Sequence, residues 1–443
     1  MHMKPIQVGV LGFGTVGSGV ARVLARNGEE IARRAGRAIE VRRVGVRNIA
    51  KARNAAPAAV VEGLAFGDDL YAVVDDPEID IVCELIGGTT LAKDLVLRAI
   101  ANRKHVVTAN KALLAIHGNE IFAAAQQAGV MVAFEAAVAG GIPIIKALRE
   151  GLTANRIEWI AGIINGTSNF ILTEMRDKGA AFADVLAEAQ RLGYAEADPT
   201  FDIGGHDAAH KLTILAALAF GIPMQFDKAY LEGISQLTRE DIGYAEQLGY
   251  RIKLLGITKR RPHGIELRVH PTLIPAKRII ANVDGVMNAV VVQGDAVGQT
   301  LYSGRGAGAE PTASAVVADL VDVTRLLTAD PEHRVPHLAF QPDRLADLPI
   351  LPIEDVETSY YLRLRAHDRP GVMADITRIL ADLSISIDAM MQKEPAEGEQ
   401  IVDIIILTHL AVERSVDTAI HLIESLPTIS GSITKLRLEN LDK

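Results

Sequence analysis

The chain has 443 residues, of which 49% are hydrophobic and 4% aromatic, and its formal net charge is −9 at pH 7. This length predicts two or three domains, and the acidic balance without a basic block argues against nucleic acid or an anionic membrane as partner. The sequence shows neither an N-terminal hydrophobic signal segment nor an apolar run of about 18 residues, so we expect a soluble, cytoplasmic protein.

The N-terminal stretch has the pattern of a dinucleotide-binding unit. A short apolar strand, Ile6 to Leu11, runs into a G-x-G-x-x-G turn, and a helical pattern follows over 16–25. The turn consists of Gly12, Phe13, Gly14, Thr15, Val16 and Gly17. Its glycines permit a tight bend and close approach of a pyrophosphate, and the helix N-terminus offers amides to the phosphates. The strand before and the helix after make this a strong signal.

The second predicted strand, 39–46, bears on the choice of dinucleotide. An NAD site presents Asp or Glu to the ribose hydroxyls at the end of this strand. Here Arg47 and Asn48 follow, with Lys51 and Arg53 close behind. A cation in place of the carboxylate favours a 2′-phosphate, hence NADPH, through a charge-assisted contact from Arg47. A solvated basic turn is the alternative.

Two further buried strands, 80–86 and 104–108, end in polar residues. Because ligands of parallel sheets bind beyond the carboxyl ends of the strands, Thr89 and Lys111 are predicted to face cofactor and substrate. A lysine at a strand end is also often merely solvated. The single cysteine, Cys83, lies inside the first of these runs and is expected to be a core residue.

A run of small residues, 135–143, follows the next predicted strand, 131–134. So many small residues favour close backbone approach over core packing. The carbonyl groups of this run either bind a monovalent cation or form a tight turn, and the spacing leaves both open. From about Glu135 the composition suits a second domain.

The stretch 193–219 concentrates charged groups. It holds Glu196, Asp198, Asp202, Asp207 and Lys211 within a short span. Pro199 argues against a helix over 194–202, and a buried helix is predicted after the glycine pair at 204–205. Asp207 then lies in the first turn of that helix, with Lys211 one turn further on the same face.

Three interpretations of this stretch compete. A solvated loop with a surface ion pair is the plainest. A pocket in which carboxylates hold an ammonium-bearing substrate while Lys211 moves a proton is the second. The spacing of His206 and His210 resembles that of a zinc-protease helix, but Asp207 replaces the glutamate base and no third ligand is evident, so zinc is disfavoured.

The remainder of the chain divides into a connection and a C-terminal module. A second glycine-rich turn, 303–311, precedes a predicted helix, 312–327, and the proline-rich stretch 335–352 is predicted to be a linker. Over 360–438 the pattern is strand, helix, strand, strand, helix, strand, which is the order of a ferredoxin-like module.

Four motifs in the chain resemble homoserine dehydrogenase. They are GYAEADPTFDIGGHDAAHKL at 193–212, TANK at 108–111, INGTSNF at 164–170 and GAGAEPTASAVV at 306–317. The resemblance covers about Val8 to Leu327. The turn at 368–372 resembles that of an ACT domain, an amino-acid-sensing module, and this layout resembles the monofunctional bacterial enzyme.

The resemblance implies an α/β fold with three domains. These are a Rossmann NADP-binding domain over 1–134, completed by about 306–345, an α+β catalytic and dimerisation domain over 135–305, and a ferredoxin-like ACT domain over 353–443. It also implies reversible reduction of L-aspartate-4-semialdehyde to L-homoserine by NADPH, with NADH use open. A homodimer or homotetramer and threonine as effector are further implications.

The resemblance assigns roles to individual residues. It implies Lys211 as general acid/base, with Asp207 and Lys111 beside it. It implies that the substrate contacts Glu196, Asp207 and Asp202. It implies that the cofactor contacts the glycine turn, Arg47, Thr89, Lys111, Gly193 and Gly308.

Two further sites are implied by the resemblance. A monovalent cation, Na⁺ or K⁺, would bind at Glu135, Val138, Gly140 and Ile142. The effector would bind at Asp368, Arg369, Pro370, Gly371 and Val372.

Two rival functions are considered. The first is an NADP-dependent dehydrogenase of another amino-acid semialdehyde or keto acid. Enzymes that pass through an acyl-enzyme need a cysteine nucleophile, and Cys83 inside a strand disfavours them. The second is a non-catalytic amino-acid sensor, against which the glycine turn, Lys111 and Lys211 argue.

Overall fold

The computed structural model describes residues 4–327, 334–392 and 400–442. Its chain forms two compact units. Unit 1 comprises Met1–Gly166, Asp207–Asp227 and Val286–Leu348, and unit 2 comprises Thr167–His206, Lys228–Gly285 and Pro349–Lys443. These units cut the chain differently from the three predicted ranges, whose boundaries stay predictions.

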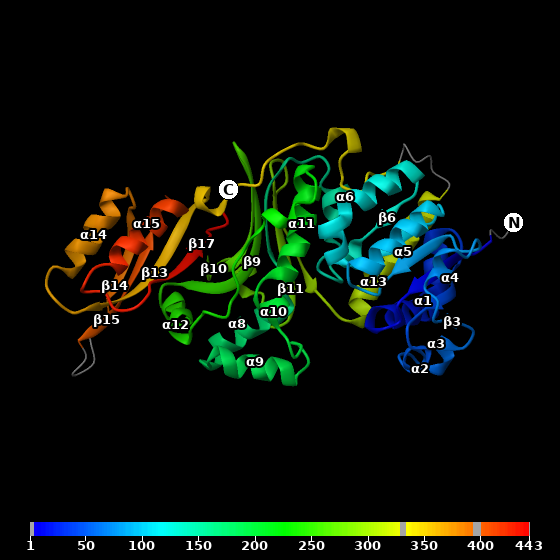
Figure 1. Ribbon diagram of the computed structural model, residues 1–443, viewed down its shortest axis with the longest axis horizontal. Coiled ribbons are helices and arrows are strands. Elements are labelled where there is room, and N and C mark those ends of the chain that lie inside the picture. Colours follow the sequence, from blue (N-terminus) through cyan, green and yellow to red (C-terminus); the bar gives the residue numbers. More distant parts are fainter. Residues whose placement is uncertain (1–3, 328–333, 393–399, 443) are drawn as a thin grey trace. The chain divides into compact units, whose positions relative to one another are not determined.

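Unit 1 contains a parallel six-stranded sheet in the order β3-β2-β1-β4-β5-β6 (Figure 1). Its strands are β1 (Ile6–Leu11), β2 (Ile39–Gly45), β3 (Ala65–Gly67), β4 (Ile81–Glu84), β5 (His105–Thr108) and β6 (Val132–Ala133). Strands β4 and β5 are buried throughout, as expected for apolar runs covered on both faces. The strand order is that of a Rossmann fold.

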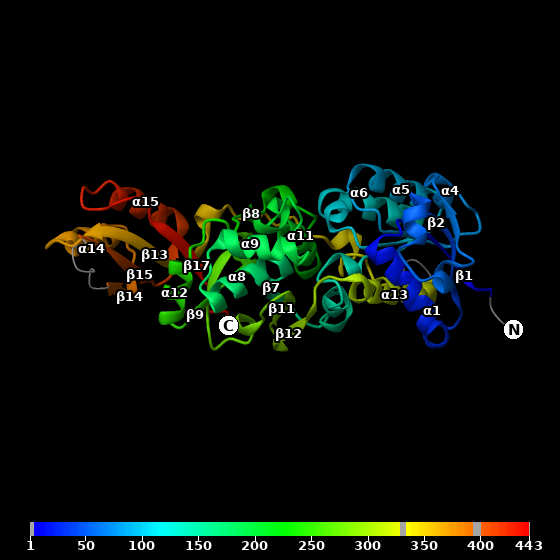
Figure 2. The ribbon, with the colours of Figure 1, turned by 90° about the horizontal axis from the view of Figure 1, so that it is seen from below.

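Helices pack in pairs against this sheet (Figure 2). Helix α1 contacts α13, and α5 contacts α6. The helices are α1 (Thr15–Ala35), α2 (Ile49–Arg53), α3 (Ala58–Val61), α4 (Tyr71–Val74), α5 (Thr90–Ala101), α6 (Lys111–Ala128) and α13 (Ala309–Leu326). Because α13 comes from late in the chain, the Rossmann unit is built from segments that lie far apart in the sequence.

The rest of unit 1 carries the buried helix predicted after the glycine pair. Strand β11 (Met287–Gly294) pairs antiparallel with both β7 (Ile157–Ile163) and β12 (Gly298–Arg305). Helix α11 (His206–Phe220) is buried at every position from Asp207 to Phe220, which identifies it as a core helix. Short helical turns lie at η1 (Glu135–Ala137), α7 (Ile144–Lys146) and η2 (Ala147–Gly151).

Unit 2 joins a long hairpin to the C-terminal module through one strand. Strands β9 (Tyr250–Arg261) and β10 (Gly264–Pro275) form the antiparallel hairpin. On its other side β10 pairs in parallel with β17 (Thr434–Leu438), which also pairs with β13 (Glu357–His367). The module therefore shares a sheet with the hairpin, a connection that periodicity alone does not reveal.

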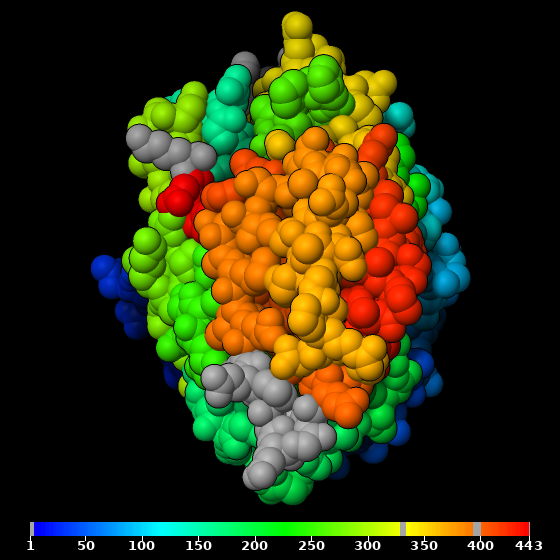
Figure 3. All heavy atoms as spheres, turned by 90° about the vertical axis from the view of Figure 1, so that its left-hand side faces the viewer, coloured from blue at the N-terminus to red at the C-terminus, as the bar shows by residue number. Residues whose placement is uncertain are grey.

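The C-terminal module has the predicted ferredoxin-like order (Figure 1). Figure 3 shows the atoms on one face of this module, coloured orange to red. Its sheet runs β17-β13-β15-β14, with β14 at Ile387–Gln392 and β15 at Ile401–Thr408. Helices α14 (Val372–Asp382) and α15 (Glu413–Glu424) carry strongly one-sided apolar faces, and these bury Ile376, Leu380, Val416 and Ile423 against the sheet.

The remaining helices of unit 2 are α8 (Gly166–Lys178), α9 (Phe182–Arg191), α10 (Thr200–Ile203) and α12 (Arg239–Gln247), and a short strand, β8 (Tyr230–Leu231), pairs with β10. The one-turn helix α10 corrects the prediction that 194–202 contains no helix. Pro199 precedes its first residue, where a missing N–H removes no helical hydrogen bond.

Helix α13 begins three residues earlier than predicted. It includes Pro311 as its third residue, a position where the backbone N–H has no partner within a helix. The first residues of the predicted turn, Ser303 to Arg305, belong instead to strand β12.

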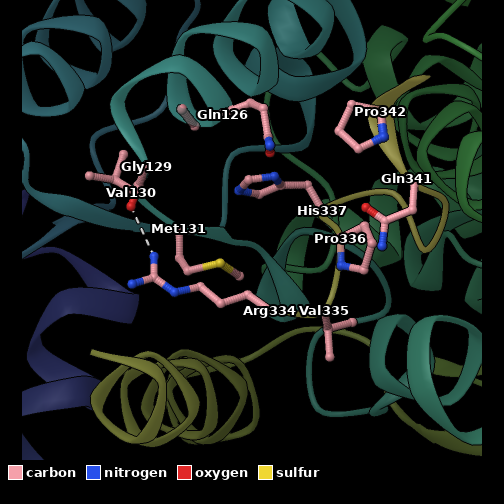
Figure 4. Close-up of a pocket in the computed structure, with 11 residues that line it drawn as sticks. Gln126, Gly129, Val130, Met131, Arg334, Val335, Pro336, His337, Gln341 and Pro342 are labelled. Carbon is pink, nitrogen blue, oxygen red and sulfur yellow. Dashed lines mark hydrogen bonds between the residues drawn. The ribbon is translucent and has the colours of Figure 1, made fainter. Parts of the chain in front are cut away.

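The predicted linker, 335–352, is packed at its start, where His337 and Leu338 are buried, whereas most of 340–349 is exposed (Figure 4). His337 Nε2 accepts a hydrogen bond from Val132 N at 3.1 Å, and Arg334 donates to Gly129 O at 2.9 Å. These residues border a cavity of ≈ 40 Å³. That is about the volume of one water molecule, so it is not a substrate site.

We predict that the packing of α13 on α1 depends on Gly19. A Cβ at Gly19 would lie 2.6 Å from Ala309 O, whereas one at Gly28 of the same helix meets nothing within 4 Å. Gly19→Ala is therefore expected to lower stability by about 1–3 kcal/mol, and Gly28→Ala to leave it unchanged or raise it. Thermal denaturation of both variants checks this, and equal melting temperatures would contradict the packing argument.

Candidate active site

The carboxylate of Asp207 lies between two lysine ammonium groups. Lys211 Nζ donates to Asp207 Oδ2 at 2.6 Å, and Lys111 Nζ lies 3.1 Å from Asp207 Oδ1. Asn165 Nδ2 also donates to Asp207 Oδ2 at 2.9 Å, and Lys211 donates to Ile164 O at 2.8 Å. The predicted Asp207–Lys211 pair thus exists, and it is the centre of a larger cluster.

Burial makes this cluster different from a surface ion pair. Only 6% of the Asp207 side chain and 11% of the Lys211 side chain are exposed. Burial opposes ionisation of Asp207, but the charges of Lys211 and Lys111 outweigh it and hold the pKa of Asp207 well below its usual range. Asp207 is therefore a fixed negative charge, and the solvated-pair interpretation is wrong.

Lys111 reaches this cluster from the first residue of α6. Asn110 caps that helix by accepting from Leu113 N, and its amide donates to Gly88 O at 2.7 Å. The turn after β5 is thereby tied to the turn after β4. About one third of the Lys111 side chain is exposed, 34%, so it joins the buried cluster to the accessible end of the sheet.

Glu84 supports the same two turns, although the sequence did not single it out. It accepts from Thr108 Oγ1 at 2.7 Å and from the amides of Ile86 and Gly87 at 3.0 and 3.2 Å. Burial raises its pKa despite these hydrogen bonds. The sequence feature that could have identified Glu84 is its position as an acidic residue at the end of an apolar strand.

The glycine turn has the geometry that a dinucleotide requires. Gly12 has φ +92°, and a Cβ there would lie 2.7 Å from Leu85 O. A Cβ at Gly17 would overlap Gly12 O, whereas one at Gly14 would meet nothing within 4 Å. Gly12 and Gly17 thus serve the turn and its packing, and the open face at Gly14, at the start of α1, suits a pyrophosphate.

The other predicted cofactor residues differ in their surroundings. The Phe13 side chain is buried edge-on against Phe66, with ring centroids 5.2 Å apart, so it serves the core. The guanidinium carbon of Arg53 lies over the ring of Phe66, 4.9 Å from the ring centroid. Arg47 is exposed just beyond β2 and makes no ion pair with any described residue.

Thr89, Gly193 and Gly308 all lie at turns. Thr89 directly precedes α5, and Gly308, with φ +123°, directly precedes α13. Gly193 has φ +76° and ends α9's terminal turn. Positive φ at both glycines explains the residue type, while their contacts with a cofactor stay predictions.

Glu196 and Asp202 belong to unit 2, on the loop that precedes α11. Helix α8 holds this loop at two points, since Thr167 Oγ1 donates to Tyr194 O at 2.6 Å and Ser168 Oγ donates to Asp202 O at 3.1 Å. Glu196 is exposed, and Asp202 is half-buried within α10. Their contacts with a substrate stay predictions.

The predicted cation loop is buried and irregular. Glu135, Val138 and Ile142 are at most 2% exposed, and Ala139 and Gly140 both have positive φ, +54° and +50°. The Glu135 carboxylate accepts from the amides of Ile145 and Lys146, each at 2.9 Å. In the described ranges no group of three or more His, Cys, Asp or Glu side chains could hold a metal ion.

The predicted effector turn lies at the start of α14. Asp368, Arg369, Pro370 and Gly371 are exposed, Val372 is buried, and Gly371 has φ +95°. The exposed start of an eleven-residue helix offers backbone amides to an anion. Whether an amino acid binds there stays a prediction.

Two other sequence expectations concern the single cysteine and the absence of a long apolar run. Cys83 is fully buried in β4, and burial raises the pKa of its thiol well above the usual range, which confirms it as a core residue. None of the helices in the described part combines the length and apolar character needed to cross a bilayer.

Comparisons with known proteins agree with this arrangement. Residues 12–135 match the model of the homoserine dehydrogenase NAD-binding domain, residues 143–321 that of homoserine dehydrogenase, and residues 360–427 that of the ACT domain. The chain is 63% identical to a homoserine dehydrogenase of Pseudomonas aeruginosa, over 99% of this chain and 100% of that protein.

Solved structures lead to the same family. A homoserine dehydrogenase from Thiobacillus denitrificans has 72% identity and a TM-score of 0.95, with 100% of both chains covered. A hyperthermophilic archaeal homoserine dehydrogenase in complex with NADPH has 25% identity and a TM-score of 0.62, covering 72% of this chain and 98% of that one. This chain belongs to the homoserine dehydrogenase family, as an oxidoreductase with an NAD-binding, a catalytic and an ACT domain.

Proposed function

We propose that the chain catalyses the reversible reduction of L-aspartate-4-semialdehyde to L-homoserine with NADPH, as part of threonine, methionine and isoleucine biosynthesis. The buried Lys211–Asp207–Lys111 cluster carries this proposal. Its charged groups suit a reaction that converts a carbonyl oxygen to a hydroxyl, and neither a nucleophile nor zinc is required. The family relationship supports the substrate.

Lys211 is proposed as the proton donor. NADPH supplies the hydride that adds to the aldehyde carbon, and the negative charge that develops on the oxygen needs a proton. Lys211 gives this proton in reduction and takes it back from the hydroxyl in oxidation. The fixed charge of Asp207 orients Lys211 and favours its protonated form, and Lys111 adds positive charge beside the reacting oxygen.

The substrate's ammonium group is assigned to the loop before α11. Both oxygens of Asp207 already accept from groups of the chain, which favours a role for it in holding the lysines. The Glu196 carboxylate is exposed and has no ion-pair partner in the described part of the chain, so it is the better candidate for the ammonium, with Asp202 beside it.

The cofactor and a cation complete the proposed site. The glycine turn binds the pyrophosphate, Thr89, Gly193 and Gly308 contact the cofactor, and Arg47 reads the 2′-phosphate. A monovalent cation, Na⁺ or K⁺, binds largely through carbonyl oxygens at Glu135, Val138, Gly140 and Ile142. The two consecutive positive φ angles at 139–140 support this, because they turn carbonyl groups out of regular secondary structure.

Regulation and assembly follow the family. Threonine is proposed as the feedback effector, bound at residues 368–372, and the enzyme is proposed to act in the cytoplasm as a homodimer or homotetramer. The exposed turn at the start of α14 supports the effector site, since helix amides suit an amino acid's carboxylate.

We predict that Lys211→Ala lowers turnover by about 10²–10⁴-fold and leaves NADPH affinity nearly intact. Lys178 provides a matched control, because it also follows an acidic residue by four positions on a helix, but is exposed. Lys178→Ala is expected to have parental turnover. Steady-state NADPH oxidation with aspartate semialdehyde measures both, and near-normal kcat in Lys211→Ala would refute the assignment.

Arg47→Ala is expected to weaken NADPH binding more than NADH binding. One charge-assisted hydrogen bond is worth about 1.5–3 kcal/mol, and only NADPH carries the 2′-phosphate. Arg53→Ala is the control, because Arg53 is held over Phe66. Fluorescence titration with both cofactors gives the four dissociation constants, and an equal loss for both in Arg47→Ala would argue against phosphate recognition.

For the effector site, Asp368→Ala is expected to reduce inhibition by threonine, with each variant's turnover without threonine as the reference. Asp382→Ala, an aspartate at the opposite end of α14, should retain inhibition. Removal of the whole module is a poor test, because β17 pairs with β10. Parent enzyme that ignores millimolar threonine at every substrate concentration would refute the regulatory role.

A further inference from the structure

An unbroken series of contacts in unit 2 joins the ACT module to the loop before Asp207. It begins at Arg437 in β17, which is 1% exposed. Its guanidinium pairs with Glu413 at the start of α15, and Nε donates to Glu413 Oε2 at 2.9 Å. Tyr360 also donates to Glu413, at 2.7 Å. Arg437 is therefore fixed from within the module.

The other end of the guanidinium reaches outside the module. Arg437 Nη1 donates to Glu232 Oε2 at 2.7 Å, and Nη2 donates to Tyr230 OH at 3.0 Å. Tyr230 OH in turn donates to Glu232 Oε2 at 2.9 Å, and the guanidinium carbon lies 4.8 Å from the Tyr230 ring centroid. Glu232 is thus held by two donors whose own positions are fixed.

The backbone beside Glu232 packs on the end of α10. Glu232 N donates to Val269 O at 2.8 Å, and Ile234 N donates to Ile203 O at 2.9 Å. Between them, a Cβ at Gly233 would overlap Ile203 O and lie 2.9 Å from Gly204 Cα. The segment 232–234 therefore contacts the segment that carries Asp202 and continues into α11.

We propose that Glu232 is a positioning residue for the substrate: clamped by Arg437 of the ACT module, it fixes the segment 203–205 and with it the loop that carries Asp202 and Glu196. The link to substrate rests on the proposed function of that loop. Glu232 itself touches neither substrate nor cofactor. The clamp also gives the ACT module a direct physical contact with the element whose position sets substrate affinity.

The test compares Glu232→Ala with Glu232→Gln, which keeps an acceptor oxygen for Arg437. Arg437 keeps its ion pair with Glu413 in both variants, and 33% of the Glu232 side chain is exposed. Neither variant therefore leaves a buried charge without a partner. The matched control is Glu246→Ala, because Glu246 is an exposed glutamate on α12. Hydrogen–deuterium exchange of peptides covering 200–206 and the KM for homoserine are the two readouts.

Glu232→Ala is expected to speed exchange over 200–206 and raise the KM for homoserine about 5- to 20-fold, with a smaller change in kcat and unchanged NADPH affinity. Glu232→Gln should lie close to the parent. Unchanged exchange in Glu232→Ala, or the same change in Glu246→Ala, would overturn the clamp. Faster exchange with parental KM would leave the clamp standing but would overturn its link to the substrate. The substrate role of the loop is decided separately by Glu196→Gln, because an unchanged KM for homoserine in that variant would argue against it.

A second pair of variants tests the same contact through the backbone. Gly233→Ala places a methyl group against Ile203 O, whereas Gly243→Ala on α12 meets nothing within 4 Å. Gly233→Ala should reproduce the exchange change of Glu232→Ala, and Gly243→Ala should not. Parental exchange in Gly233→Ala would overturn the proposal, even where Glu232→Ala is too unstable to measure.

Discussion

The burial of one carboxylate, Asp207, constrains the whole catalytic region of unit 1. A charge removed from water needs compensation from nearby groups of opposite charge and from hydrogen-bond donors. Lys211, Lys111 and Asn165 supply it from three places, namely α11, the start of α6 and the turn that follows β7. Removing Asp207 would take from the buried ammonium of Lys211 the carboxylate with which it pairs. The requirement for electrostatic balance therefore positions the proposed proton donor.

That balance also explains why a lysine suits this place. An isolated buried ammonium tends to lose its proton because burial disfavours the charged form. Lys211 instead donates to Asp207, and the charges of Lys211 and Lys111 hold the pKa of that carboxylate well below its usual range. The same cluster reaches, through Lys111, the strand ends where the Rossmann fold binds its ligands. The geometry thus links Lys211 on α11 to the strand ends of the parallel sheet.

Buried charged groups are also paired in unit 2. Its ACT module shares strand pairing with the β9–β10 hairpin through β10 and β17, and buried ionic groups lie along this boundary. Arg268 pairs with Glu266 and Glu439, and Arg363 pairs with Asp241. Separating these groups would leave buried charges without their partners, which favours keeping the module in contact with its neighbours. In the proposed clamp, the Arg437–Glu232 pair adds a contact of this kind next to the segment that carries Asp202.

The sequence by itself determined much of the local structure. The glycine turn, the Rossmann strands, the buried helix after the glycine pair and the ferredoxin-like order follow from short-range patterns, because periodicity and backbone restrictions act over a few residues. The placement of Asp207 and Lys211 on one face was equally a local inference. Helix α10 and the start of α13 were not predicted, because the sequence alone does not distinguish a proline that begins a helix from one that ends it.

Only the tertiary structure decided which distant groups meet. Asn165 and Lys111 join Asp207 from positions 42 and 96 residues away in the chain, and nothing in their local patterns marks the contact. The pairing of β17 with β10, the packing of the expected linker and the Arg437–Glu232 clamp are of the same kind. They depend on the balance of buried charge and on backbone hydrogen bonds between remote segments, and those are settled only when the chain has folded.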